Sequence, residues 1–266
     1  MLQIAVTGAS GRMGGLFMEH LEGLEDVQGL ALPSLPPSDA TAKTSIVERV
    51  SALDRVCRKQ MCDVIVDFSS PEATLAYAVW AASKKVPMVI GTTGFTLDQL
   101  DQLADILHSV PALLSPNMSL MMNLAWRMTA NATAVLPHET VDVEIVEKHH
   151  RDKRNAPSST ALKIAQIVAE KRGWSLAEAL RHNSRWGMIG SRPQKEIAIA
   201  SVRGGTLISE HSIVFAGPGE SLEITHRSQS LEPFARGSLR AARWIVKQSP
   251  GVYDMLDMLG LTEVAY

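Results

Sequence analysis

Between residues 2 and 117 the chain alternates short apolar runs with longer amphipathic stretches, and this alternation restricts the fold more than any other feature. The apolar runs, expected to be strands, are residues 2–8, 27–32, 63–69, 86–94 and 111–117. The stretches at 14–24, 45–60, 72–85 and 96–109 repeat apolar residues at helical spacing. Strands alternating with helices of this length form βαβ units, and uniformly apolar strands are covered on both faces. The pattern predicts an α/β fold with a parallel sheet.

After about residue 120 the pattern changes to strands with only one apolar face. Residues 140–150 alternate strictly, placing Val141, Val143 and Ile145 on one face. Residues 195–230 are typical of three further strands, with Gly204–Gly205 expected as a hairpin turn and "AGPGES" as the next reversal. A helix is expected at 158–173, capped by Ser158 or Ser159 and ended by Gly173. This half is therefore expected to pack one sheet face on a helix.

The change of pattern predicts two domains. We expect the first to comprise residues 1–120 plus 232–266 and the second residues 121–231. The tail at 234–259 is expected to be helical throughout and to return to the first domain. A Pro/Ser-rich stretch at 31–44 is expected to be a loop after the second strand.

Composition excludes several classes of protein. The 266 residues carry a formal net charge of −2, which gives no basic field for nucleic acid or an anionic membrane. We find no signal peptide and no apolar run of the roughly 18 residues that span a bilayer. Cys57 and Cys62 are too few for a disulfide scaffold and are not spaced as a CxxC pair. We expect a soluble, cytoplasmic protein.

The stretch "VTGASGRMGG" follows the first expected strand and opens the first helix. Gly8, Gly11 and Gly14 form a variant of the dinucleotide fingerprint in which Ala9 replaces the usual first glycine. Such a turn lets a pyrophosphate approach a helix N-terminus, although a simple packing turn is the alternative. The acidic residue expected about 20 positions on, which would bind the ribose, is missing, and Ser34 is the nearby polar candidate. The choice between NADH and NADPH is therefore open.

Two more loops follow apolar strands, "GTTGF" at 91–95 and "SPNMS" at 115–119. Ligands of open parallel sheets bind at the carboxyl ends of the strands, so both loops are candidates to line a nicotinamide site. Ordinary turn chemistry explains either loop equally well.

The stretch "EKHHRDKRNAPSSTAL" at 147–162 concentrates histidines and basic residues. His149 and His150 point to opposite faces if the strand continues, and no nearby cysteine completes a zinc set, so we predict no metal site. A solvated basic loop is one interpretation. The other is a site for a small dianion, in which His149, His150 or Lys153 donates protons and the helix start binds a carboxylate.

These motifs together resemble the 4-hydroxy-tetrahydrodipicolinate reductase family, also called dihydrodipicolinate reductase, over essentially the whole chain. The resemblance includes "GASGRMG", "DVIVDFSSPEAT", "ISEHSIVFAGPGESLEITHRSQS" and most of the signature E-x-H-H-x-x-K-x-D-A-P-S-G-T-A. It implies a Rossmann-type domain, a second α+β domain on a mixed sheet, a homotetramer, and NADH- or NADPH-dependent reduction in diaminopimelate and lysine biosynthesis. The implied substrate is a small cyclic dicarboxylate, reduced by hydride at C4 and a proton at the neighbouring carbon.

The resemblance also assigns roles to residues. His149 and Lys153 match the catalytic positions, and His150, Ser159 and Thr160 match the substrate-binding positions. The positions that match cofactor contacts are Gly8, Ala9, Ser10, Gly11, Arg12 and Met13, then Gly91, Thr92 and Thr93, and then Ser115, Pro116, Asn117 and Met118.

Three positions depart from the family pattern. Asn155 replaces an aspartate, and Ser159 and Met121 replace glycines. These changes leave open a reductase of a different small cyclic imine or unsaturated dicarboxylate. A dinucleotide-sensing protein without catalytic activity is a third hypothesis, although a sensor would need neither His149 nor Lys153.

Overall fold

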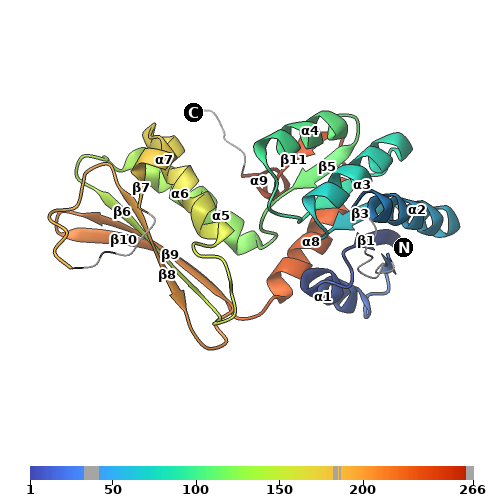
Figure 1. The fold of residues 1–266 in the computed structure, drawn as a ribbon, viewed down its shortest axis with the longest axis horizontal. Helices are drawn as coiled ribbons and strands as arrows, with labels where there is room; N and C mark the ends of the chain where they lie inside the picture. Colours follow the sequence, from blue (N-terminus) through green and yellow to red (C-terminus); the bar gives the residue numbers. More distant parts are fainter. Residues whose placement is uncertain (33–41, 182–184, 186, 262–266) are drawn as a thin grey trace. The chain divides into compact units, whose positions relative to one another are not determined.

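The computed structural model of the protein describes residues 1–32, 42–181, 185 and 187–261 (Figure 1). The chain forms two compact units, Met1–Leu120 with Leu231–Tyr266, and Met121–Ser230. Most of the Pro/Ser-rich stretch, including Ser34, lies outside the described residues. The helices in the described part of the chain are too short or too polar to cross a membrane.

The first unit contains the predicted parallel sheet. Its six strands lie in the order β11-β5-β4-β3-β1-β2, and all their pairings are parallel. The strands are β1 (Leu2–Thr7), β2 (Val27–Ala31), β3 (Val64–Asp67), β4 (Met88–Ile90), β5 (Pro111–Leu114) and β11 (Gly251–Tyr253). Strands β3 and β4 are buried at every residue, as uniformly apolar strands require.

Helices cover both faces of this sheet. They are α1 (Arg12–Leu21), α2 (Ala42–Gln60), α3 (Pro71–Lys84), α4 (Leu97–Leu107), α8 (Glu232–Ile245) and α9 (Met255–Leu259). Successive strand residues point to opposite faces, so Ile4 and Val6 pack with α1, α8 and α9, and Ala5 packs with α2, α3 and α4. Local signals fix the helix starts: Ser70 caps α3, and Thr96 with Gln99 forms a capping box on α4.

The tail corrects one prediction. It is not helical throughout, because β11 separates α8 from α9 and pairs with the edge strand β5 from Pro111 to Leu113. The strand is three residues long, too short for a periodicity to be visible, and it forms because β5 offers unpaired backbone groups. The end of the chain therefore completes the sheet that its beginning started.

The second unit is built on a mixed sheet with the order β10-β9-β6-β8-β7. Its strands are β6 (Asp142–His149), β7 (Leu180–Arg181), β8 (Ile197–Arg203), β9 (Ser209–Gly217) and β10 (Glu220–Ser228). Its helices are α5 (Leu120–Val135), α6 (Ser159–Arg172) and α7 (Leu176–Ala179), and the predictions did not include α5, α7 or β7. Ser158 caps α6 and Gly173 ends it in a left-handed conformation, as predicted.

The predicted hairpin at Gly204–Gly205 is wrong. Strand β6 lies between β8 and β9, pairing with β8 in parallel and with β9 antiparallel, so the glycines cross the end of β6. The Gly204 N–H donates to the carbonyl of His149 at 3.0 Å, and the Arg151 N–H donates to the carbonyl of Gly205 at 3.1 Å. The reversal at "AGPGES" is confirmed, because β9 and β10 pair directly from Gly217 and Glu220. The crossing chain therefore fixes the loop that follows His149.

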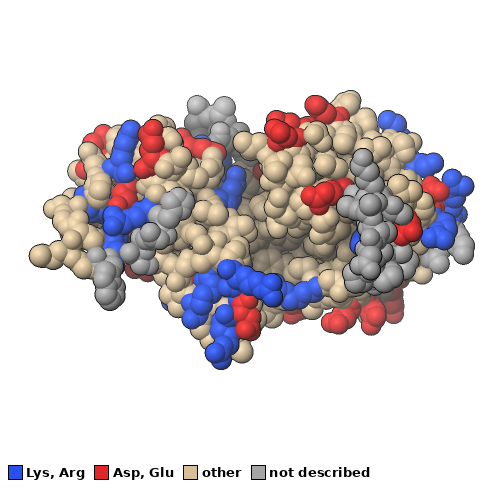
Figure 2. Space-filling model, viewed as in Figure 1, with Lys and Arg blue, Asp and Glu red and all other residues tan. Residues whose placement is uncertain are grey.

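One face of this sheet packs on α5 and α6 through an apolar core. Val143 and Ile145 of β6 share this core with Trp126 of α5 and Ile164 of α6. The opposite face carries half-exposed side chains such as Val146, Lys148 and Val214. Figure 2 shows Lys and Arg interspersed with Asp and Glu on the visible face of both units.

Candidate active site

The glycine turn after β1 adopts a backbone conformation that side chains at Gly8 and Gly14 would prevent. Gly8 has φ +70°, and a Cβ there would lie 2.3 Å from the carbonyl oxygen of Phe68. A Cβ on Gly14 would lie 2.1 Å from the carbonyl oxygen of Gly8. Gly11, the N-cap of α1, has no side chain to accept from the first N–H groups, and the first turn contains no acidic residue. This helix start therefore fits the phosphates of a dinucleotide.

The predicted residues of this turn differ in accessibility. Ser10, Gly11 and Arg12 are exposed, and Ala9 and Met13 are half-buried. The exposed members lie at the N-terminus of α1, where the Gly11 N–H donates to the carbonyl of Gly8 at 2.9 Å and closes the turn.

A buried carboxylate, Asp67, lies at the carboxyl end of β3. Four hydroxyls donate to it: Thr7 at the end of β1, Ser69 at 2.6 Å, Thr74 of α3, and Thr92 after β4 at 2.8 Å. The Ser69 N–H also donates to the Thr92 hydroxyl at 3.0 Å. Asp67 thus ties together the strand ends that precede the glycine turn and the "GTTGF" loop.

The two predicted nicotinamide loops follow β4 and β5. A Cβ on Gly91 would lie 2.7 Å from the ring of Phe68, the residue whose backbone carbonyl also restricts Gly8, so the two glycine loops approach the same residue. Thr92 is buried with its hydroxyl bonded to Asp67, whereas Thr93 is exposed. A cofactor contact by Thr92 would therefore use its backbone.

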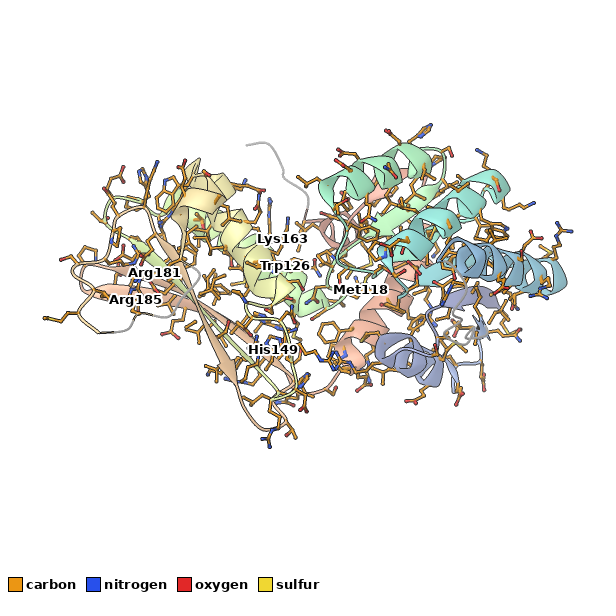
Figure 3. All side chains as sticks on the ribbon, viewed as in Figure 1. Met118, Trp126, His149, Lys163, Arg181 and Arg185 are labelled. Carbon is orange, nitrogen blue, oxygen red and sulfur yellow. The ribbon has the colours of Figure 1, made fainter. Side chains whose placement is uncertain are left out.

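The "SPNMS" loop after β5 is held mainly by its own polar groups. The Ser115 hydroxyl donates to the carbonyl of Asn117 at 2.9 Å, and the Asn117 side chain accepts from the Ser119 N–H at 2.9 Å. Met118 is 3% exposed and belongs to the core beside α8, where a Cβ on Gly237 would lie 1.7 Å from its carbonyl oxygen. Pro116 is exposed. The Met118 side chain therefore anchors the loop in the core (Figure 3).

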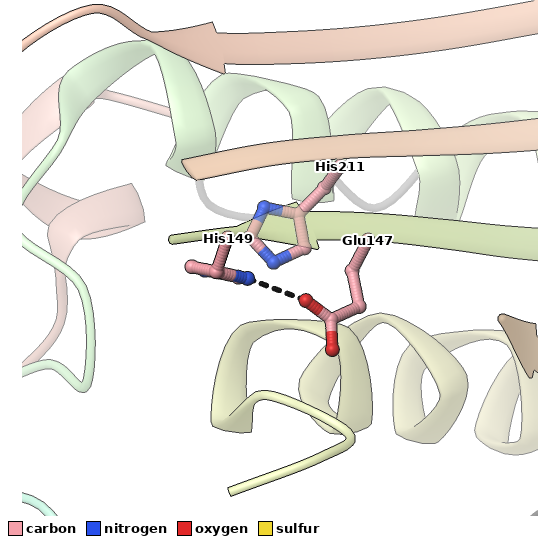
Figure 4. Close-up of side chains that lie close together, drawn as sticks. All are labelled: Glu147, His149 and His211. Atoms are coloured by element: carbon pink, nitrogen blue, oxygen red, sulfur yellow. Dashed lines mark hydrogen bonds and ion pairs between the residues drawn. The ribbon is translucent and has the colours of Figure 1, made fainter. Parts of the chain in front are cut away.

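In the second unit, the buried face of β6 changes from apolar to polar at its carboxyl end. The alternation that buries Val143 and Ile145 continues to Glu147 and His149, which are 0% and 7% exposed. The Glu147 carboxylate accepts from Nδ1 of His149 (Figure 4) and from both terminal nitrogens of Arg203, at 2.9 and 2.7 Å. Burial opposes ionisation of Glu147, but hydrogen bonds from His149, Arg203 and Ser201 outweigh it and lower its pKa to about 2.

His211 lies beside this pair on β9. It is paired in register with Glu147, and its ring centroid is 5.2 Å from that of His149. Burial lowers the pKa of His211 to about 3, with a further contribution from His149, so its ring is neutral. Its Nε2 lies 2.9 Å from the hydroxyl of Ser158, which also accepts from the Ala161 N–H as the cap of α6. His211 therefore holds the helix start next to His149.

The loop at 150–157 folds back onto this end of the sheet. Its Asn155 carbonyl accepts from Arg203 at 2.7 Å, and the Lys153 N–H donates to the carbonyl of His150 at 3.2 Å. His150 and Lys153 are half-buried, and Lys153 contributes to the lowered pKa of His211. Ser159, exposed, and Thr160, half-buried, follow in the first turn of α6. The loop is therefore more than a solvated basic segment.

Within the described residues, Glu147, His149 and His211 form a group whose ligand atoms lie within 4.8 Å of one another, as a metal site requires. Arg203, however, donates to both oxygens of Glu147, so a cation would have to displace a guanidinium or bind beside one. The group therefore fits an ion pair better than a metal ion. This group was not predicted from the sequence, because His211 comes from another strand.

Four residues of these sites were not predicted. Glu147 could have been found, because it lies two positions before His149 on an alternating strand. Arg203 and His211 become visible only through the registers of β8 and β9 with β6. Asp67 carried no signal beyond a polar residue at the end of an apolar strand.

The chain matches the family description "Dihydrodipicolinate reductase, N-terminus" over residues 2–118 and "Dihydrodipicolinate reductase, C-terminus" over residues 121–259. A protein named 4-hydroxy-tetrahydrodipicolinate reductase from Anaeromyxobacter dehalogenans is 40% identical over 98% of each chain. One of the same name from Syntrophus aciditrophicus is 41% identical over 98% of this chain and 99% of its own. The solved structure of a dipicolinate-bound dihydrodipicolinate reductase from Paenisporosarcina sp. TG-14 is 25% identical, with a TM-score of 0.75 over 97% of this chain and 98% of that chain.

Proposed function

Because this chain belongs to the dihydrodipicolinate reductase family, we propose that it reduces 4-hydroxy-tetrahydrodipicolinate to tetrahydrodipicolinate in diaminopimelate and lysine biosynthesis. It is an oxidoreductase with a nicotinamide dinucleotide cofactor. The observation that carries the proposal is that both halves of the family description match, one in each unit of the chain.

The first unit is proposed to bind the cofactor, which supplies the hydride when bound. We assign the pyrophosphate to the turn from Gly8 to Met13, because Gly8 and Gly14 leave no room for side chains and the start of α1 offers free N–H groups. The nicotinamide side is assigned to residues 91–93 and 115–118. NADH and NADPH are both candidates.

The second unit is proposed to bind the dicarboxylate substrate, and dipicolinate in the related solved structure is a compound of this class. The N-terminus of α6, with Ser159 and Thr160, and the side chain of His150 would bind its carboxylates. Lys153 would donate the proton to the carbon next to the one that receives hydride, and His149 would balance the negative charge.

The alternative substrates depend on the three departures from the family pattern. The Asn155 backbone carbonyl bonds to Arg203, and Ser159 keeps its backbone N–H in the first turn of α6, so neither change removes a backbone donor from the proposed carboxylate site. Met121 is 75% exposed. A dinucleotide sensor has no evident use for a buried carboxylate that holds the ring of His149.

Assembly and location complete the proposal. We propose a homotetramer in the cytoplasm, as the resemblance to the family implies.

The test is a coupled assay. The preceding synthase would generate the substrate in the cuvette from pyruvate and aspartate semialdehyde, and oxidation of NADH or NADPH would be followed by absorbance. We expect oxidation that depends on the synthase, and the faster cofactor identifies the preference. If the reduced cofactor binds but is not oxidised, the substrate assignment is wrong and a different imino dicarboxylate is indicated.

A further inference from the structure

Glu147 is a buried carboxylate that the proposed chemistry does not use directly. It has no exposed surface, and burying a charge is unfavourable unless partners replace the lost water. Arg203 provides a two-pronged ion pair, and Nδ1 of His149 provides the third hydrogen bond. The carboxylate is therefore a fixed acceptor facing one nitrogen of His149 (Figure 4).

Arg203 is itself held in place. It is paired in register with His149 across β6 and β8, and it donates to the carbonyls of Val202 at 2.8 Å and Asn155 at 2.7 Å. Asn155 belongs to the same loop as Lys153. One guanidinium thus links the carboxylate, the strand that bears His149 and the loop that bears Lys153.

The other groups around His149 differ in charge from Glu147. His211 on β9 is neutral, with a pKa of about 3. Burial also lowers the pKa of His226, which lies on β10 and is paired in register with His211. Ser158 at the start of α6 bonds to His211, and the cationic groups are Arg203 on β8 and Lys153 in the loop. Glu147 supplies the negative charge in contact with His149.

We infer that Glu147, held by Arg203, is a positioning residue that fixes the ring orientation and tautomer of His149. A carboxylate only accepts, so the Nδ1 proton of His149 stays on the side of Glu147. Nε2 is then the nitrogen that gains or loses a proton and the one available to a substrate. The inference rests on the proposed function only for the identity of that substrate.

The first test needs no turnover. Nitrogen-15 NMR of histidine-labelled, substrate-free protein would report the tautomer of each ring, with the His149 signals assigned by loss in His149→Asn. We expect a proton on Nδ1 of His149 and a lone pair on Nε2 in the neutral form. The opposite tautomer would overturn the inference while leaving the proposed function standing.

The second test is Glu147→Gln. Arg203 has only donors, so it will hold the amide oxygen and turn the amide nitrogen toward His149. His149 must then present a lone pair at Nδ1 and move its proton to Nε2, a switch that the same NMR experiment detects. We expect kcat to fall about 100-fold, because a wrong tautomer blocks proton exchange even when geometry is intact. The cofactor Kd should stay within twofold.

The pH profile of kcat/KM separates a positioning role of Glu147 from a role in stability alone. Removal of the carboxylate changes the charge beside the ring proposed to exchange the proton, so the profile of kcat/KM should change, whereas simple loss of folded protein lowers the rate without changing the profile. A fall in kcat that tracks loss of folded protein, with an unmoved profile, would overturn the inference.

Glu144→Gln is the matched control. Glu144 lies on the same strand and also binds two arginines, Arg185 and Arg192, but it points to the opposite face. Figure 3 labels Arg185 in the part of this unit away from His149. The turnover rate, the His149 tautomer and the pH profile of Glu144→Gln should match those of the unsubstituted protein.

If Glu147→Gln does not fold, a second variant is available. Arg203→Lys keeps the positive charge but loses the two-pronged geometry of the guanidinium. We expect kcat of this variant to fall about tenfold, with the pH profile unmoved. An unchanged kcat in that variant would overturn the role of Arg203.

Discussion

Asp67 and Glu147 are both fully buried carboxylates at the carboxyl end of a central strand, one in each unit, yet their partners differ in kind. Asp67 accepts from four neutral hydroxyls that come from one strand, one helix and two loops. Glu147 accepts from a guanidinium and an imidazole. Both sets of partners supply hydrogen bonds to the buried carboxylate oxygens. The need for hydrogen bonds therefore does not explain why the partners of Asp67 and Glu147 differ in kind.

The difference lies in what the partners can do. Hydroxyls do not change charge near neutral pH, so the Asp67 network fixes loop positions and nothing more. An imidazole nitrogen can donate or accept a proton, so the Glu147 network can take part in proton transfer. We therefore propose cofactor support for the first unit and proton chemistry for the second, and substitutions in the two units should fail in different ways.

The largest expected effect is that of Lys153→Ala in the second unit. Loss of a proton donor should lower kcat about 1,000-fold, while the Kd of the reduced cofactor, measured by fluorescence, changes less than twofold. Lys163→Ala is the control, because Lys163 is exposed on α6 (Figure 3) and should keep full activity. Equal losses of kcat and cofactor affinity in Lys153→Ala would remove the division between the units.

Acid should destabilise the second unit through His211 and then Glu147. The pKa of His211 is about 3 in the folded protein, against 6.5 for an ordinary histidine in the unfolded chain. As pH falls, the unfolded chain therefore binds this proton before the folded protein does. The contribution of neutral His211 to stability is complete above pH 6.5 and is lost as pH drops toward 3. The lowered pKa of Glu147 adds a loss between pH 4.5 and about 2. We expect the free energy of unfolding to fall by about 3 kcal/mol between pH 7 and pH 4.

Urea unfolding at pH 7, 5 and 4, followed by tryptophan fluorescence, measures this slope. His211→Gln should flatten it, whereas His108→Gln, at an exposed position on the other unit, should keep it. An identical slope in both variants would show that buried His211 is not its origin.

Gly14→Ala tests the first unit. The added Cβ would lie 2.1 Å from the carbonyl oxygen of Gly8, so the turn must move. We expect the cofactor Kd to rise about 100-fold, or about 2.7 kcal/mol, with kcat at saturating cofactor within threefold of the original. Gly23→Ala is the control, because a Cβ there has open space around it. A fall in kcat without a change in Kd would contradict the assignment of this turn.

The contrast between the units also separates what sequence could predict from what it could not. The parallel sheet followed from local patterns, since each apolar strand and each amphipathic helix is continuous in the chain. The polar end of β6 was equally local, because Glu147 and His149 are two residues apart on an alternating strand.

Contacts between distant segments were not predictable in this way. The partners of Glu147 on β8 and β9 depend on strand order, and the expected hairpin at Gly204–Gly205 placed those strands side by side instead of around β6. The hydroxyls of Thr7, Thr74 and Thr92 meet at Asp67 only because β1, β3 and β4 are neighbours. A three-residue strand such as β11 depends on the edge it completes, not on its own sequence.

Thr92→Val should have the smallest effect, and it decides whether the Thr92 hydroxyl serves stability or cofactor binding. Its hydroxyl donates to Asp67 at 2.8 Å and accepts from the Ser69 N–H at 3.0 Å, so valine should cost about 1–2 kcal/mol of unfolding free energy. The cofactor Kd should change less than twofold, because valine keeps the backbone groups at this position. Thr93→Val is the matched control next to it, exposed on the same loop, and should leave stability unchanged. If Thr92→Val instead weakened cofactor binding at full stability, the Asp67 network would belong to the binding chemistry, and the contrast with Glu147 would fail.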